Sequence, residues 1–401
     1  MPSQLASRLD AVKPSATLAI NARAQELRAK GVDVISFGAG EPDFDTPTNV
    51  REAGVRAIEE SKTRYTPVAG IAPLRAAIAE QSTRERGVAA RPENVVVTVG
   101  AKGALFNLAL ALFEPGDEVV IPTPCWVSYP EQVRLCGATP VFVESTFAQG
   151  WKVSPEDLAR ALTPRTKAVI LCSPSNPTGA AYTEAELAAL ADVLRDSDCW
   201  VVTDEIYGAL VYEGFAQRSI LSVAPELLPR AVIIDGVSKT FAMTGWRVGW
   251  SIAPAALSKA METIQSQGAT STATPSQWAA LEALRAPALE LDQMRALFQL
   301  RRDRLVEGLR AIPGVRCAMP DGAFYAFADV SAWIGQRPGD GAALATDVDI
   351  AAWLLDEAHV AVVPGSAFMA PGHMRLSYAV SLDDIDRAVA RIAKAAATLH
   401  R

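Results

Sequence analysis

The sequence predicts an α/β fold in which a mostly parallel sheet carries helices on both faces and a smaller α+β domain is attached. From about residue 50 to 290, short apolar runs alternate with longer helical patterns. The apolar runs are nearly continuous, which is typical of strands covered on both faces. After about residue 290 a long amphipathic pattern leads into three short strand-like runs and a final helix. This change of pattern indicates the smaller domain.

The large sheet is predicted from six apolar runs with helical patterns between them. The predicted strands are residues 94–99, 117–122, 166–172, 199–205, 230–236 and 247–253. Thr183 stands three residues before Glu186, which is the spacing of a helix capping box. The helix that starts at Gly100 is apolar on nearly all sides, so we expect it to be buried. It should end before Pro115 and Gly116.

We expect the chain to divide into three parts. Residues 1–45 should form an N-terminal segment that packs with the small domain, residues 46–290 a large domain, and residues 291–401 the small C-terminal domain. The chain has 401 residues, of which 50% are hydrophobic, so it can bury a large core.

Composition argues against several classes of protein. The net charge is −7 with no long basic run, so we expect no nucleic-acid or membrane partner. Three histidines and scattered cysteines without a CxxC pair predict no metal site. The first residues lack the pattern of a secretory signal, and no apolar run is long enough to span a membrane. We therefore expect a cytoplasmic protein whose cysteines stay reduced.

Candidate binding residues follow the predicted strands, because ligands of open parallel sheets bind beyond the carboxyl ends of the strands. Gly100, Ala101 and Lys102 follow the first strand and open a helix, where free N–H groups attract phosphate. A glycine before a helix is more often ordinary turn geometry. Asn176 lies in the rigid loop SPSNPTG after the third strand, where the alternative is an ordinary Asn- and Pro-rich turn.

Two further strand ends carry charged residues. Asp204 and Tyr207 follow the fourth strand, and Ser238 and Lys239 follow the fifth. Singly, a carboxylate at a strand end is usually solvated and a lysine is usually a surface charge. Together the four ends offer an anion cradle, an amide, a carboxylate with a phenol, and an amine. That set suits pyridoxal phosphate, whose enzymes need a lysine for the Schiff base and an acid beside the pyridinium nitrogen.

Seven segments carry a family resemblance that covers nearly the whole chain. The segments are residues 13–47, 65–80, 97–131, SPSNPTG (173–179), VVTDEIY (201–207), SKTFAMTGWRVGW (238–250) and GHMRLSYA (372–379). In these segments the chain resembles the class I, fold-type I pyridoxal-phosphate aminotransferases. The resemblance is strongest to the bacterial aspartate/prephenate aminotransferase branch.

The resemblance implies roles for residues that would hold the cofactor. Lys239 would be the Schiff-base lysine and then the general base and acid, and Asp204 would pair with the pyridine nitrogen. Asn176 and Tyr207 would bond the ring oxygen, and Trp126 would stack on the ring. The phosphate would be bound by Arg247, the backbone of Ala101 and Lys102, Ser238, and Tyr65 of a neighbouring subunit. The last role implies a homodimer with shared active sites.

The resemblance also implies the substrates. Arg375, helped by the backbone of Gly40, would bind the α-carboxylate, and Lys102 with Thr17 would recognise the distal group. The expected reaction moves the amino group of aspartate or glutamate to a 2-oxo acid such as 2-oxoglutarate by a ping-pong route. Prephenate or aromatic substrates are the alternative, and a pyridoxal-phosphate lyase or regulator is less favoured. Cys125 and Gly103 depart from the usual pattern, which affects substrate preference.

Overall fold

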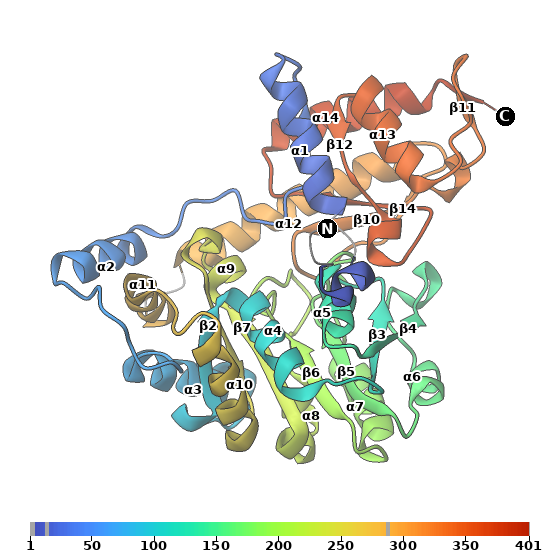
Figure 1. The fold of residues 1–401 in the computed structure, drawn as a ribbon. Helices are drawn as coiled ribbons and strands as arrows, with labels where there is room; N and C mark the ends of the chain where they lie inside the picture. The colour runs from blue at the N-terminus through green and yellow to red at the C-terminus, as the bar shows by residue number, and fades with distance from the viewer. Residues whose placement is uncertain (1–4, 13–15, 286–288, 401) are drawn as a thin grey trace.

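The protein folds into a large lobe around a seven-stranded sheet and a smaller lobe above it (Figure 1). The computed structural model describes residues 5–12, 16–285 and 289–400. The sheet has the order β2-β8-β7-β6-β5-β3-β4. Its strands are β2 (Val95–Val99), β3 (Glu118–Thr123), β4 (Thr139–Glu144), β5 (Thr166–Cys172), β6 (Trp200–Asp204), β7 (Ala231–Gly236) and β8 (Val248–Ile252).

All six predicted strands are present, and the predicted mostly parallel sheet is confirmed. Only β8 runs antiparallel, against both β2 and β7, while β3, β4, β5, β6 and β7 pair in parallel. β4 was not predicted. It is an edge strand in which Val143 alone is buried, so it lacks the burial on both faces that is typical of the central strands.

Helices cover both faces of the sheet. One face packs against α2 (Thr48–Glu59), α3 (Ala72–Arg86), α6 (Pro155–Ala161), α7 (Glu184–Arg195), α8 (Ile220–Val223) and α11 (Thr274–Arg285). The other face packs against α4 (Gly100–Leu112), α5 (Ser128–Leu135) and α10 (Ala255–Gln267). The capping box at Thr183 forms as expected and begins α7.

The expectation that the helix from Gly100 is buried all round is wrong. In α4, Leu105 and Leu108 pack into the core, but Phe106 and Leu110 are 39% and 42% exposed. The sheet can cover only one side of a helix in this layer, so the opposite apolar side faces outward. An exposed apolar side of this kind marks a surface that another protein can cover.

The small lobe is built on a four-stranded antiparallel sheet of order β13-β14-β10-β9. Its strands are β9 (Arg316–Cys317), β10 (Tyr325–Asp329), β13 (Val363–Pro364) and β14 (His373–Ser377). The helices α12 (Leu289–Arg310), α13 (Asp347–Glu357) and α14 (Leu382–Ala396) pack on it, and β11 (Arg337–Pro338) pairs with β15 (Leu399–His400). Short 3-10 helices are η1 (Ser7–Ala11), η2 (Pro92–Asn94), η3 (Phe147–Gln149), η4 (Pro225–Arg230), η5 (Thr244–Trp246), η6 (Ser331–Trp333) and η7 (Gly365–Phe368).

The N-terminal part of the chain packs on the small lobe before it crosses to the large one. Helix α1 (Ala16–Ala29) lies beside the small-lobe helices in Figure 1, and β1 (Ile35–Ser36) pairs in parallel with β12 (Val360–Ala361). Residues 37–47 then run as an extended segment to α2 in the large lobe. We call residues 37–47 the bridging segment. It passes the carboxyl ends of the parallel strands, where Lys239 lies in α9 (Val237–Thr240).

Candidate active site

A cavity of about 1140 Å³ lies at the carboxyl ends of the parallel strands and is lined by both lobes. The predicted residues among its lining are Gly40, Ala101, Lys102, Trp126, Asn176, Asp204, Tyr207, Ser238, Lys239, Arg247 and Arg375. Strands β5, β6 and β7 end side by side, which brings Asn176, Asp204 and Lys239 together although they are far apart in the sequence. The site therefore combines loops of one sheet with residues of the small lobe.

Lys239 presents a weakly basic amine to this cavity. Its short helix α9 follows β7 directly, and its Nζ donates a hydrogen bond to the carbonyl oxygen of Gly40. The pKa of Lys239 is lowered to about 8, mainly by burial; the charge of Glu41 opposes this shift, and the positive charges of Arg375 and Arg247 add to it. About a tenth of the amine is therefore neutral at pH 7. A neutral amine is the form that can attack a carbonyl carbon.

Asp204 is a buried acid at the end of β6. Its side chain accepts hydrogen bonds from the Tyr129 hydroxyl at 2.6 Å and from the backbone N–H of Ile206 at 3.2 Å. Burial raises the pKa of Asp204 to about 6, and the hydrogen bond from Tyr129 acts in the opposite direction. No arginine or lysine within the described part of the chain forms a salt bridge with it. A cationic ring nitrogen would supply the missing charge.

Arg375 is a buried guanidinium that lacks an acidic partner. It is 2% exposed, and it donates to Asn176 Oδ1 at 3.0 Å and to the carbonyl oxygen of Gly38 at 2.9 Å. Its guanidinium lies over the rings of Tyr325 and Phe368, with its central carbon 4.6 and 5.0 Å from the ring centres. Its Nε has no hydrogen-bond partner. A buried cation held only by neutral groups is costly unless a ligand carries the opposite charge.

The N-terminus of α4 and Arg247 form a cradle suited to an anion. Gly100 has φ +72°, and a side-chain carbon placed there would lie 2.5 Å from Arg247 Nη2, so only glycine lets the arginine lie this close. Arg247 Nη1 donates to the carbonyl of Thr244 at 2.9 Å. The free N–H groups at the start of α4 and the permanent charge of Arg247 both favour a phosphate group.

Aromatic and amide groups complete the walls. Tyr207 and Tyr325 share a hydrogen bond between their hydroxyls at 2.9 Å, and both are buried. Trp126 meets Tyr129 edge to face, with ring centres 5.4 Å apart. Lys102 has its Nζ 4.9 Å from the centre of the Trp126 ring, at the open side of the cavity. Burial, and next the charge of Arg247, lower the pKa of Lys102.

Comparison with known proteins gives a consistent result. The family model for aminotransferase class I and II matches residues 32–392. The chain belongs to the class I and II aminotransferase family. It is 46% identical to a probable aspartate/prephenate aminotransferase of Rhizobium leguminosarum bv. phaseoli, and the match covers 97% of both chains.

Solved structures of aminotransferases have the same fold. The aspartate aminotransferase from Rhizobium meliloti has a TM-score of 0.96 and 43% identity, covering 99% of this chain and 100% of that chain. The Thermus thermophilus aspartate aminotransferase with maleate has a TM-score of 0.92 and 46% identity, covering 98% and 100%. The predicted fold-type I class and the predicted transaminase activity are both confirmed, and enzymes of this kind depend on pyridoxal phosphate.

The residues of this aminotransferase fit that cofactor. A weakly basic amine, a buried acid without a cationic partner and an anion cradle line one cavity, and each matches a different group of pyridoxal phosphate. Trp126 contributes an aromatic face and Tyr207 a hydroxyl to the same space.

Two predicted residues are not among the described lining of the cavity. Tyr65 is 89% exposed and does not line the cavity of its own chain. Thr17 lies in α1, but its side chain is outside the described part of the structure. The carbonyl of Gly40 accepts from Lys239, and the carbonyl that accepts from Arg375 belongs to Gly38; the expected contact of Gly40 with the substrate stays a prediction.

Sequence reasoning missed Tyr129 and Tyr325, which contact predicted site residues. Tyr129 lies three residues after Trp126 in the segment PCWVSYP, and that spacing was available as a signal. Tyr325 comes from β10 in the small lobe, and nothing in the local pattern GAFYAF distinguishes it from a core residue. Among the described residues no cluster of three potential ligands could hold a metal ion. A search of the same residues for a helix long and apolar enough to cross a membrane finds none.

Proposed function

We propose that this aminotransferase moves the amino group of aspartate or glutamate to a 2-oxo acid such as 2-oxoglutarate by a ping-pong mechanism. The observation that carries this proposal is Arg375, a fully buried guanidinium without an acidic partner and with an unpaired Nε, in the same cavity as the Lys239 amine. An α-carboxylate bound to Arg375 would place the neighbouring α-amino group near Lys239. Several relatives are named aspartate aminotransferases, which supports the dicarboxylic donor.

In this proposal each cofactor-facing residue has one task. Lys239 would bind the cofactor aldehyde covalently, and the cradle of Arg247, Ser238 and the backbone of Ala101 and Lys102 would bind the phosphate. Asp204 would pair with the ring nitrogen, while Asn176 and Tyr207 would bond the ring oxygen and Trp126 would stack on the ring. When bound, pyridoxal phosphate supplies an electron sink that stabilises negative charge at the α-carbon of the amino acid.

The residues of the chain then move protons. With the amino donor bound, the neutral amine of Lys239 would be the general base that accepts the α-proton and would then donate it as an acid. Its lowered pKa suits this exchange, because a group titrating at about 8 can both accept and donate a proton near neutral pH. Ionised Asp204 would keep the ring nitrogen protonated. Because Asp204 is buried, the attraction between its negative charge and the positive ring nitrogen would be only weakly screened by water.

Lys102 is the proposed contact for the distal carboxylate. Its Nζ lies over Trp126 at the open side of the cavity and forms no salt bridge within the described residues. Gly40 and Thr17 remain proposed substrate contacts from the bridging segment and the N-terminal helix.

Prephenate is the second candidate acceptor. Several relatives are named aspartate/prephenate aminotransferases, some of them only as probable, and the cavity of about 1140 Å³ is large enough for such a bulkier acid. Like aspartate, prephenate carries two carboxylates, so Arg375 and Lys102 could bind both substrates.

We further propose a homodimer whose active sites contain residues of both subunits. The strongly exposed Tyr65 and the outward apolar side of α4, with Val99, Phe106 and Leu110, support a covering partner on this side. A cytoplasmic location is also proposed, and the five cysteines, all without a disulfide, are consistent with a reducing compartment.

The direct test is a panel of amino donors against 2-oxoglutarate and prephenate with the purified holoenzyme. We expect aspartate consumption to be matched by equal oxaloacetate and glutamate formation. Free ammonia or pyruvate formed from the donor would instead indicate a lyase. Efficient turnover restricted to monocarboxylic donors would contradict the proposed substrate class.

A further inference from the structure

The backbone of the bridging segment accepts hydrogen bonds from Arg375 and Lys239 of the active site. The carbonyl oxygen of Gly38 accepts from Arg375 Nη2 at 2.9 Å, and the carbonyl oxygen of Gly40 accepts from Lys239. Neither glycine has a side chain that could fix its position. The orientation of both carbonyls therefore depends on how the rest of the segment is anchored.

The strongest anchor is an ion pair with the small lobe. Arg301 of α12 donates through Nη1 and Nη2 to the two carboxylate oxygens of Asp43, at 2.7 and 2.9 Å. The Arg301 side chain is 8% exposed, while that of Asp43 is 32% exposed. The guanidinium also lies over the rings of Phe44 and Phe298, which pack edge to face with centres 5.2 Å apart. A two-bond fork of this kind fixes direction as well as distance.

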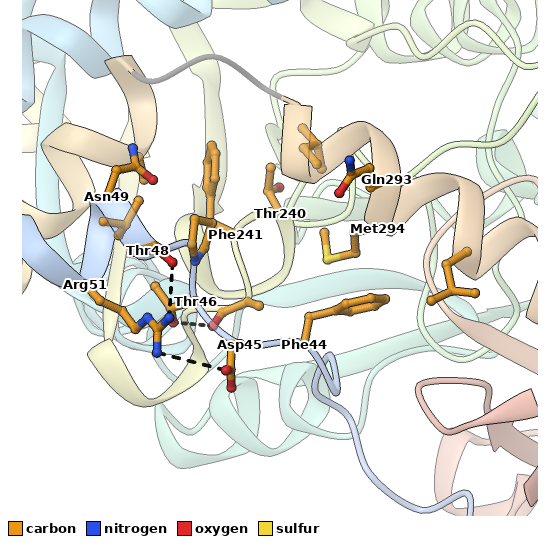
Figure 2. A pocket seen from close by; sticks show the side chains of 16 residues that line it. Phe44, Asp45, Thr46, Thr48, Asn49, Arg51, Thr240, Phe241, Gln293 and Met294 are labelled. Carbon is orange, nitrogen blue, oxygen red and sulfur yellow. Dashed lines mark hydrogen bonds and ion pairs between the residues drawn. The ribbon is translucent and has the colours of Figure 1, made fainter.

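On its other side the segment is poorly supported by packing. A cavity of about 380 Å³ lies between the residues from Phe44 onward, the end of α9 and the start of α12. Figure 2 shows Phe44 and Met294 on one side of this space and Phe241 on another. An unfilled space offers no van der Waals contacts that resist movement of its walls. The position of the segment therefore depends on a few polar contacts.

The start of the segment is also anchored in the small lobe, because the N–H of Phe37 donates to the carbonyl of Ala361 and its carbonyl accepts from the N–H of Ser377, both at 2.9 Å. The remaining polar contacts tie the segment to the large lobe. Thr46 Oγ1 donates to the carbonyl of Ala242 at 2.7 Å and accepts from Trp246 Nε1 at 3.0 Å. Thr244 Oγ1 donates to Glu41 at 2.8 Å, in an exposed position. Asp43 is thus the second point, after Phe37, at which the segment is held to the small lobe, and the two glycines that reach the active site lie between these points.

We propose that Arg301 is a positioning residue for substrate binding: by holding Asp43 it sets the bridging segment so that the Gly38 carbonyl orients Arg375. This inference rests on the proposed role of Arg375 in binding the α-carboxylate. Arg301 does not line the active-site cavity and touches no reacting group. Its loss should therefore weaken substrate binding far more than it slows the chemical step.

The chain offers a matched control on the same helix. Arg304 also forms a two-bond pair, from Nε and Nη2 to Asp386 at 2.6 and 3.0 Å, and it lies one turn from Arg301. Arg304 is 57% exposed and links α12 only to α14, away from the bridging segment. The variants to compare are Arg301→Met, Arg301→Lys, Asp43→Asn and Arg304→Met in the holoenzyme.

The measurements are kcat, KM for the amino donor, the Kd of maleate and the melting temperature. We expect Arg301→Met to raise KM and the maleate Kd by roughly ten- to a hundredfold, which is the effect of losing a charge-assisted contact, while kcat changes by less than about threefold. Asp43→Asn should resemble it, and Arg301→Lys should be intermediate because it keeps the charge but loses the fork. Arg304→Met should match the wild type in all ligand measurements.

The other outcomes overturn the inference. An unchanged KM and maleate Kd in Arg301→Met would show that the Arg301–Asp43 pair serves stability alone. If Arg301→Met does not fold, the same result in Asp43→Asn and Arg301→Lys would show this. A fall in kcat with an unchanged KM would also contradict it. If the wild type prefers another donor, the dicarboxylate proposal fails, but the same comparison is then made with that donor and its unreactive analogue.

Discussion

The hydrogen bond from Tyr129 to Asp204 provides a quantitative test of the site. Tyr129→Phe removes a 2.6 Å bond to an acid that is 3% exposed and leaves the backbone N–H of Ile206 as its remaining partner. A hydrogen bond to a charged group contributes about 1.5–3 kcal/mol, and one pKa unit corresponds to about 1.4 kcal/mol. Because the bond stabilises the ionised form, its loss should raise the pKa of Asp204 by about 1–2 units from its value of about 6.

The assay is the affinity of the apoenzyme for pyridoxal phosphate as a function of pH. Only ionised Asp204 can pair with a protonated ring nitrogen, so the affinity should weaken as pH falls through the pKa of this acid. In Tyr129→Phe the weakening should begin at a pH about 1–2 units higher than in the wild type. The cofactor phosphate and Lys239 also titrate in this range. The test therefore compares the midpoint pH of cofactor binding in Tyr129→Phe with that in the wild type, and does not depend on either midpoint alone.

Tyr182→Phe is the matched control. Tyr182 is another buried tyrosine whose hydroxyl is bonded, here to the backbone N–H of Val153 at 3.0 Å, and it does not line the active-site cavity. Its loss should leave the pH profile of cofactor binding unchanged. If Tyr129→Phe had the wild-type profile, or if Tyr182→Phe moved it equally, the reasoning about the Asp204 hydrogen bond would be refuted.

Four more predictions concern the charged residues of the site. Lys239→Ala should fold, as judged by circular dichroism, but should lose turnover, because Lys239 both binds the cofactor and moves the proton. A rate near that of the wild type would contradict this role. In the apoenzyme, the rate of Lys239 with an aldehyde reagent should rise with pH to a plateau with a midpoint near 8 rather than the ordinary 10.5, and a midpoint near 10.5 contradicts the burial argument. Asp204→Asn should keep its melting temperature but lower kcat at least about a hundredfold, since a neutral amide stabilises a cationic ring nitrogen poorly; full activity would make Asp204 an ordinary strand-end acid. Lys102→Ala should lower kcat/KM for aspartate by roughly ten- to a hundredfold and for a monocarboxylic donor much less, whereas equal losses would assign Lys102 to the cofactor.

Sequence reasoning predicted the site residues that follow the parallel strands, because ligands of such sheets bind beyond the carboxyl ends of the strands. Asn176, Asp204 and Lys239 each follow a strongly apolar run, and parallel strands bring such ends to one edge of the sheet. The same rule predicted the anion cradle at Gly100, because a helix begins there immediately after β2. Local pattern and topology agree at these positions, so no distant contact had to be known.

The part that was missed depends on packing between distant segments. Tyr325 reaches the site from an antiparallel strand of the other lobe, and the carbonyl of Gly38 reaches it from the bridging segment. No periodicity in either stretch shows which atoms will face Arg375. Edge strand β4 and the outward side of α4 were misjudged for a related reason, because a run of residues does not reveal how many of its sides the neighbouring elements cover.

Two largely buried arginines, Arg86 and Arg375, differ in whether acidic residues neutralise their charge, and this difference distinguishes a structural arginine from a ligand-binding one. Arg86, from α3, donates to Glu205 at 2.9 Å and also to Asp235, so both acids have a partner and the cation is neutralised. Glu205 is further bonded by Ser219 at 2.6 Å. Arg375 is more deeply buried than Arg86, yet no acid of the described residues pairs with it and its Nε is unbonded. Burying an uncompensated cation destabilises the fold by itself, so Arg375 is explained by a ligand that brings the missing negative charge. The same argument applied to Asp204 requires a ligand with a positive group. A cofactor with a cationic ring and a substrate with a carboxylate together satisfy both requirements within one cavity.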